Sequence, residues 1–215
     1  MRNAMTMLLA GLLFASMSVT TGCGTLNGTI PFRYVPSLPS AKPDKTVNLG
    51  VEKLLDNRPK DDKEATDAIT DVDEKVTAKL IEDFRSSQIF ASVDFPVEKK
   101  DDLVLKGEIK RFYWKLSPSP IIFIPLLNLL MYFGIDIYNI ESVAEFHIQL
   151  INPKTGQSLA EYNKSSTKAQ SYTLYNFKAG EAGAELAEAF REVSKQIKDA
   201  IISDLRSDRL KVAQN

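Results

Sequence analysis

The stretch SPSPIIFIPLLNLLMYFGIDIYNI, residues 117–140, constrains the fold most, because it is far more apolar than the rest of the chain. Between Ile121 and Tyr138 fourteen of eighteen side chains are apolar, against 44% for the whole sequence, and Asp136 is the single charge. Alternating apolar and polar residues, the pattern of half-buried strands, stand on both sides of it. Some other surface must therefore cover this stretch or bind it.

A single membrane-spanning helix does not fit this stretch. Pro125 suits the first turn of a short helix, and Gly134 suits the position just past its end. Nine residues at 1.5 Å each make about 13 Å, less than half of a hydrocarbon core of about 30 Å. A helix over 121–138 would enclose Pro125 and Asp136, and would put the next strand on the wrong side of the membrane. We therefore expect an apolar insertion, residues 117–140, in one folded domain.

Three interpretations of this insertion remain open from the sequence. It could fold back over the outer face of a sheet, since Phe112 and Trp114 share the parity of the outward-facing Lys106, although a bulge at Arg111 would undo half of that argument. It could instead dip into the membrane as a hairpin, or dock into a partner protein or a second copy. The side chains that we expect to make such a contact are Ile121, Ile122, Phe123, Leu126, Leu127, Leu130, Met131, Phe133 and Trp114.

Alternation predicts the strands. The inward positions that we expect are Val47, Leu49, Val51 and Leu55 before a polar loop, Leu103, Leu105 and Ile109 before the insertion, and Ala144, Phe146, Ile148 and Leu150 after it. A short strand is expected at IFASVDF, residues 89–95, and a turn at NPKTG, residues 152–156, leads into a last strand.

Two amphipathic helices complete the pattern. One is expected from Asp71 to Ser86, with Thr70 or Asp71 opening a capping box, and one spans Leu186 to Leu205. Each has one apolar stripe, so both must lie on one face of a sheet. The predicted fold is an α/β two-layer sandwich with a mixed or antiparallel sheet of four to five strands. The predicted order is β-α-β-β-(apolar loop)-β-β-α.

The amino terminus has the features of a secretory signal peptide. Arg2 precedes an apolar run from Met5 to Met17, and small residues follow up to Cys23. The run is too short for a membrane span. Cys23 is the only cysteine in the chain, so an intrachain disulfide is impossible.

The segment VTTGC resembles the lipobox of bacterial lipoproteins, with Gly22 and Cys23 matching and Thr20 where leucine is commoner. The resemblance implies that residues 1–22 are removed and that Cys23 carries fatty acyl chains such as palmitate. Because residue 24 is glycine rather than aspartate, it also implies the outer membrane, with the protein facing the periplasm. Residues 23–45 contain four prolines and are expected to form a tether, although IPFRYVP, residues 30–36, could instead lie along the domain as an edge strand. A single domain is expected over 46–206, followed by a polar tail at 207–215.

The whole pattern is similar to a group of small envelope proteins. The lipobox, the proline-rich tether, the motifs DNRP, IFASV and DLVLKGEI and the closing helix together resemble small α/β lipoproteins of the YajG type and, more loosely, the amino-terminal domains of CsgG and TolB. The resemblance implies non-enzymatic work in envelope assembly, secretion or transport complexes. It supplies no catalytic residue.

Direct signs of chemistry are few. His147, the single histidine, stands on the outward parity of a strand, and zinc sites of histidine and cysteine need more ligands than one of each. The acidic segment at 56–74 lacks the spacing of a calcium loop and is expected to be a solvated loop. With 27 basic and 28 acidic residues and no basic stripe, nucleic acid is not an expected partner. We expect neither enzyme activity nor a cofactor or metal.

These features lead to one hypothesis and one alternative. The hypothesis is a lipid-anchored, non-catalytic envelope lipoprotein that is attached to the membrane through acylated Cys23. It would bind an envelope protein partner or form a homo-oligomer, as an accessory of an assembly, secretion or transport complex. The alternative is a periplasmic carrier of lipid or another hydrophobic ligand, in which the helices and the insertion would enclose a cavity.

Overall fold

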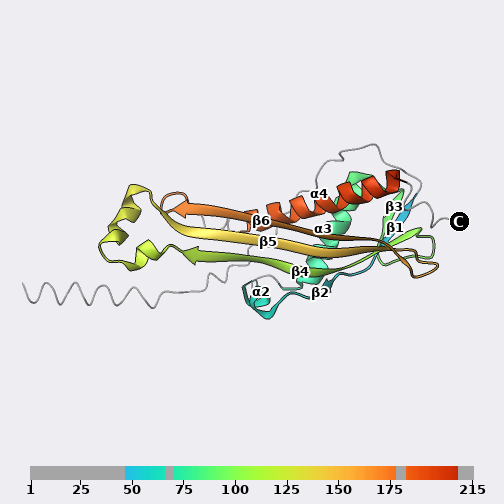
Figure 1. Cartoon of the computed structure of the whole chain (residues 1–215), viewed down its shortest axis with the longest axis horizontal. Coiled ribbons are helices and arrows are strands. Elements are labelled where there is room, and N and C mark those ends of the chain that lie inside the picture. The colour runs from blue at the N-terminus through green and yellow to red at the C-terminus, as the bar shows by residue number, and fades with distance from the viewer. Residues whose placement is uncertain (1–46, 66–69, 178–182, 208–215) are drawn as a thin grey trace, which may run out of the picture.

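The computed structural model describes residues 47–65, 70–177 and 183–207. The predicted signal peptide, Cys23, the tether and the part of the tail after Ser207 lie outside these residues. A long, open sheet runs along the molecule, and two long helices lie against it (Figure 1).

The sheet is mixed. Its strands are β1 (Asn48–Val51), β2 (Leu55–Asp56), β3 (Ser92–Asp94), β4 (Leu103–Pro118), β5 (Asp136–Ile151) and β6 (Ser158–Thr173). The spatial order is β3-β1-β4-β5-β6, with β2 beside β4. The short strands pair in parallel with each other or with β4, whereas β4, β5 and β6 form an antiparallel meander. The α/β class is confirmed.

The predicted strand number and order were wrong at the start of the domain. Val47, Leu49 and Val51 are buried as expected, but Leu54 rather than Leu55 continues the core, and Leu55 is exposed. The chain leaves the sheet after Val51 and returns as β2, which makes six strands within the described residues. A short helix, α2 (Lys60–Ala65), follows.

Part of the acidic segment packs on β4 and is not the solvated loop that we expected. Arg58 is buried and donates two hydrogen bonds to the Asp56 carboxylate, each 2.9 Å long, and one of 3.0 Å to the carbonyl of Phe112. The guanidinium holds the pKa of Asp56 below its ordinary value. In α2, Asp62 accepts a 3.0 Å hydrogen bond from Arg111. These bonds fix β2 and α2 on β4 and satisfy charges that would be costly to bury alone.

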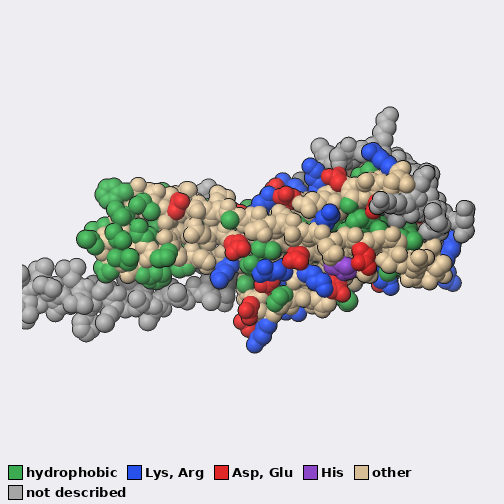
Figure 2. All heavy atoms as spheres, viewed as in Figure 1, with side chains coloured by type: hydrophobic (Ala, Val, Ile, Leu, Met, Phe, Trp, Pro, Cys, Tyr) green, Lys and Arg blue, Asp and Glu red, His purple; other side chains and the backbone are tan. Residues whose placement is uncertain are grey.

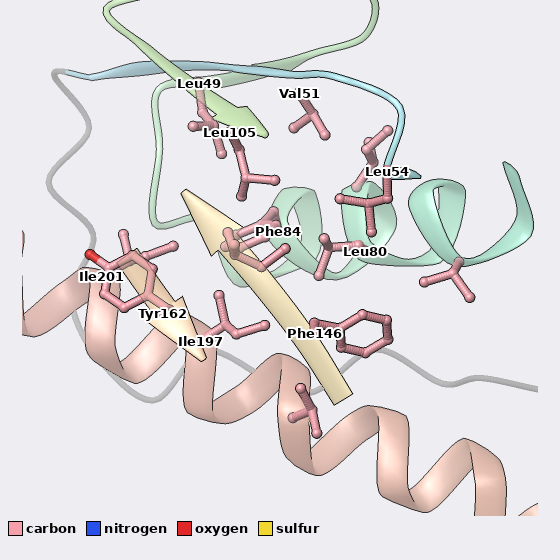
Figure 3. Packing of buried hydrophobic residues seen from close by; sticks show 14 of the residues in the cluster. Leu49, Val51, Leu54, Leu80, Phe84, Leu105, Phe146, Tyr162, Ile197 and Ile201 are labelled. Carbon is pink, nitrogen blue, oxygen red and sulfur yellow. The ribbon is translucent and has the colours of Figure 1, made fainter. Parts of the chain in front are cut away.

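Both predicted helices form, and they share one face of the sheet. They are α3 (Val72–Ser87) and α4 (Ala184–Arg206). The predicted capping box does not form, because Asp71 has a left-handed backbone and makes no side-chain cap bond. Figure 3 shows Leu80 and Phe84 of α3 and Ile197 and Ile201 of α4 packed with side chains of the sheet in one core.

A buried ion pair joins the two helices. The Nζ of Lys198 in α4 lies 2.7 Å from Oδ2 of Asp83 in α3, and Ser194 donates a hydrogen bond to the same oxygen. All three side chains are buried. Pairing of this kind offsets the cost of removing two charges from water, and breaking it leaves one charge uncompensated.

A bulge in β4 decides which side chains reach the core. The pairing of β4 with β5 shifts between Ile109 and Arg111, so Ile109 and Phe112 both point to the helices and both are fully buried. Beyond the bulge Phe112 packs edge-on to Phe190 of α4, with ring centroids 6.3 Å apart. The outer half of β4 therefore turns Phe112 and Trp114 inward.

Candidate interaction surface

The apolar insertion projects from the end of the sheet. The strands β4, β5 and β6 each have sixteen residues, which corresponds to a length of roughly 50 Å, and they continue past the start of α4 (Figure 1). Two 3₁₀ helices, η1 (Pro120–Phe123) and η2 (Leu127–Phe133), connect β4 to β5. The turn after β6 lies beside them, since Tyr175 donates a 2.7 Å hydrogen bond to the carbonyl of Tyr132. We call residues 119–135 together with Leu174 and Tyr175 the apolar tip.

The large side chains of this tip face solvent. The exposed fraction is 71% for Phe123, 78% for Leu126 and 81% for Phe133. None of the residues of η1 and η2 is buried. Figure 2 shows the hydrophobic side chains gathered over the end of the molecule, apart from the charged side chains of the body. A monomeric protein rarely exposes a contiguous apolar surface of this kind without a contact for it.

Eight of the nine predicted contact residues lie together in the tip. Phe123, Leu126, Leu127 and Phe133 are exposed, whereas Ile121, Ile122, Leu130 and Met131 are partly buried. The ninth, Trp114, does not join them, because the bulge turns it to the helix face of the sheet. Leu174 and Tyr175 were missed, since no pattern in the sequence connects them with residues some forty positions earlier.

The predicted helix of the insertion has a different form. It begins at Leu127 rather than at Pro125, and it is a 3₁₀ helix. Its predicted end is correct, because Gly134 follows Phe133 with φ of 81°, a left-handed conformation that favours glycine.

The structure overturns the interpretation that the insertion folds back over the outer face of the sheet. The outer-face residues nearest to the insertion, Lys115, Asn139 and Glu141, are exposed. Farther back along β4, Arg111 covers this face: it lies over the ring of Tyr113 at 4.8 Å and donates a hydrogen bond to Asp62 of α2. Phe112 and Trp114, which were expected to make this face apolar, point the other way after the bulge. The insertion itself projects past the end of the sheet with its large side chains exposed, so it does not cover this face.

A small aromatic cluster supports the base of the tip on the helix side. Its buried members are Ile140 and Tyr172, and Trp114, Leu116, Tyr138 and Phe177 pack against them. Tyr172 donates a hydrogen bond to Glu185 at the start of α4. Among the residues that the structure describes, the buried atoms Trp114 Nε1, Ser142 Oγ and Glu185 Oε2 have no hydrogen-bond partner.

Chemistry elsewhere on the described surface is limited to local pairs. His147 lies on the outer face as predicted, with Nδ1 2.6 Å from Oδ1 of Asn163 on the neighbouring strand. Burial, and then the hydrogen bond to Asp204, raises the pKa of Tyr162. No group of three or more metal-ligating side chains gathers in the ranges that the structure describes. Within the same ranges, none of the helices has both the length and the hydropathy needed to cross a bilayer.

Comparison with known proteins gives structural neighbours alone. No family model and no curated protein matches this sequence. The chain is similar to protein XCC0632 from Xanthomonas campestris, described with the family model DUF330, with a TM-score of 0.50 and 13% identity, covering 82% of this chain and 95% of that one.

Two further neighbours are less similar. A minor lipoprotein from Acinetobacter baumannii has a TM-score of 0.40 and 10% identity, covering 73% of this chain and 93% of its own. PelC from Paraburkholderia phytofirmans, described as a dodecamer, has a TM-score of 0.38 and 12% identity, covering 75% and 93%. At these identities the likeness shows the fold alone. The lipobox and the resemblance to the YajG type stay predictions.

Proposed function

We propose that this chain is a lipid-anchored, non-catalytic lipoprotein of the bacterial outer membrane, facing the periplasm. It acts as a partner-binding or self-assembling accessory of an envelope assembly, secretion or transport complex. The observation that carries this proposal is the apolar tip, which is exposed at the end of a sheet whose core is complete without it.

The core does not need the tip for its own stability. The buried side chains of the main core come from β1, β3, β4, β5, β6, α3, α4 and the segments that connect them, and none comes from residues 119–135. Water therefore meets large apolar groups whose burial would gain about 1.5 to 3 kcal/mol each. A protein with this surface gains free energy when it contacts another envelope component.

The amino-terminal sequence supports a place at the membrane. Gly22 and Cys23 match the lipobox, and the proline-rich segment after them is long enough to let the folded domain stand away from the anchor. The scarcity of histidine and cysteine supports a role through contacts rather than through catalysis.

The alternative of a hydrophobic-ligand carrier receives no comparable support. That alternative needs the helices and the insertion to enclose a common cavity. The side chains of α3 and α4 pack directly on the sheet, and the insertion lies beyond the start of α4 (Figures 1 and 3).

Photo-crosslinking in intact cells tests the proposal. A photoreactive amino acid is placed at Phe133 in the tip, at Asn163 on β6 and at Arg191 on α4, and Leu55 on β2 provides an exposed apolar control. We expect protein adducts, to a second copy or to another envelope protein, from at least one of the first three positions and not from Leu55. Absence of protein adducts at all three, together with a monomer after extraction in mild detergent, would refute the accessory role.

A further inference from the structure

We propose that the apolar tip inserts into the hydrocarbon of a lipid bilayer and so provides a membrane contact besides the predicted acyl anchor. This proposal rests on the proposed function in one respect, because both require the tip to be a contact surface. The alternative occupants are a second copy of the chain and a groove on a protein partner.

The side chains of the tip suit hydrocarbon better than a protein surface. No charged residue occurs from Leu116 to Ile135. The polar side chains in this segment are Ser117, Ser119, Asn128 and the hydroxyl of Tyr132. Protein interfaces carry about one hydrogen bond per 100 to 200 Å² and a polar rim, which this surface is poorly equipped to make. A bilayer requires no such partners.

The backbone of the tip is also prepared for a dry environment, where an unpaired N–H or C=O group is costly. Pro120 and Pro125 have no N–H group to satisfy. Several of the other N–H groups donate hydrogen bonds to carbonyl groups nearby. The donor and acceptor residues are Ser119 and Ile137 (2.7 Å), Ile122 and Ser119 (3.1 Å), Ile124 and Ile121 (3.3 Å), Asn128 and Ile124 (2.8 Å), and Gly134 and Met131 (3.4 Å). Both sheet edges remain behind the tip rather than in it.

The base of the tip has the composition of a membrane interface. The exposed Tyr132 and Tyr175 and the half-buried Tyr138 place phenol groups there, and the hydroxyl of Tyr175 binds the carbonyl of Tyr132. Of the nearest charges along the strands, Asp136 lies on the tip side of Tyr138, at the level of these tyrosines, and Lys115 lies behind them. Apolar tip, tyrosine collar and charged strands follow the order of hydrocarbon, interface and water in a membrane-bound protein.

The shape and size of the tip also favour a bilayer. The tip is a projection at the end of the long axis (Figures 1 and 2), so a protein partner would need a matching cavity, whereas lipid chains rearrange around it. The seven residues of η2 extend roughly 14 Å at about 2 Å each. This length suits shallow insertion into one leaflet, because interfacial elements bury about 5 to 10 Å into the acyl boundary.

The predicted anchor and the tip can reach the same membrane. Val47 leads into β1 at the end of the molecule opposite to the tip (Figure 1). Cys23 and the tip can therefore meet one membrane only if the segment between Cys23 and Val47 is able to span the roughly 50 Å length of the long strands. From Cys23 to Val47 there are 24 residues, enough for roughly 70 Å in an extended proline-rich conformation at about 3.1 Å per residue.

Site-specific fluorescence tests this insertion without the acyl anchor. The chain from residue 23 carrying Cys23→Ser has no cysteine, so Leu126→Cys, Phe133→Cys or the control Leu55→Cys each accept one environment-sensitive label. The labelled proteins are mixed with vesicles of phosphatidylethanolamine and phosphatidylglycerol that carry nitroxides on the headgroups or within the acyl chains. We expect blue-shifted emission at 126 and 133, with stronger quenching by acyl-chain nitroxides, and no change at 55.

Charge substitutions supply the second measurement. The double variant Leu126→Asp with Phe133→Asp should bind vesicles at least about tenfold more weakly, because ionised groups are expensive to move into hydrocarbon. Both positions are highly exposed, so its circular dichroism should equal that of the parent. The matched variant Leu55→Asp should retain vesicle binding.

The results of these experiments distinguish a bilayer from a second copy and from a protein partner. The insertion is refuted if vesicles cause no change in the fluorescence of the folded protein. It is also refuted if a blue shift grows with protein concentration in the absence of vesicles, because that result would indicate contact with a second copy. If vesicles have no effect while Phe133 gives protein adducts in cells, the proposed function stands and the bilayer contact fails. If vesicle insertion holds and no position gives protein adducts, the bilayer contact stands and the accessory role fails.

Discussion

The same substitution at two phenylalanines, Phe190→Ala and Phe133→Ala, should have very different effects on the stability of the fold. Phe190 is fully buried, with its ring edge-on to those of Phe112 and Phe146 at 6.3 and 5.8 Å between centroids. Removing a buried phenylalanine costs about 3 to 5 kcal/mol, which includes the cavity that remains. Phe133 has 81% of its surface exposed, so about a fifth of a burial term of 1.5 to 3 kcal/mol is at stake, roughly 0.3 to 0.6 kcal/mol.

Urea unfolding of the chain from residue 23 with Cys23→Ser, followed by circular dichroism at low protein concentration, measures both effects. We expect a large fall in the midpoint for Phe190→Ala and a nearly unchanged midpoint for Phe133→Ala, with equal slopes. If Phe190→Ala does not fold, Phe190→Leu keeps the comparison measurable. A loss above about 2 kcal/mol for Phe133→Ala in the monomer would show that the tip is part of the core, and our reasoning on its exposure would be wrong.

Three further predictions concern the body of the domain. Asp83→Asn removes the carboxylate charge that lies 2.7 Å from the Nζ of the buried Lys198 and should lower the free energy of unfolding by about 3 to 5 kcal/mol in the same urea assay, whereas Asp83→Leu with Lys198→Met should recover much of it. Gly107→Ala should cost about 1 to 3 kcal/mol in thermal or urea unfolding, because its Cβ would lie 2.7 Å from the carbonyl oxygen of His147, a backbone atom. Burial raises the pKa of Asp101, so the stability that this group contributes is present below its ordinary pKa of 3.8 and is lost as the pH rises. We therefore expect Asp101→Asn to be at least as stable as the parent in urea unfolding at pH 7. The advantage of the variant should be gone near pH 3.

Periodicity was sufficient to predict the elements that alternate or repeat without interruption. The inward positions of β5 and the apolar stripe of α4 are buried as expected, because each side chain there has the environment that its spacing implies. The strand that begins at Val47 was predicted too long, since nothing local distinguishes Leu54 from Leu55 as the next core residue. That choice depends on the packing of Leu54 against α3, which is a tertiary contact.

Two other features depend on partners distant in sequence. The bulge near Arg111 arises from pairing with β5, and it reverses the face of every later side chain in β4, including Trp114. The burial of Arg58 depends on the carbonyl of Phe112, which lies 54 residues away. The candidate site itself was largely predictable, because most of it lies in one continuous segment, and the sequence alone could not reveal Tyr175 beside it.

The small cluster at the base of the tip has a consequence for the timescale of amide exchange. Around Ile148 the strand β5 lies in the main core, whereas around Ile140 it is held by a cluster with two buried side chains. Buried atoms of the neighbouring Trp114 and Glu185 have no hydrogen-bond partner within the described part of the chain. Amides near Ile148 should exchange only when the whole domain unfolds, and those near Ile140 through local opening at lower free energy. The outer end of the sheet is then a separate cooperative unit, which can adjust to the surface it meets while the body stays folded.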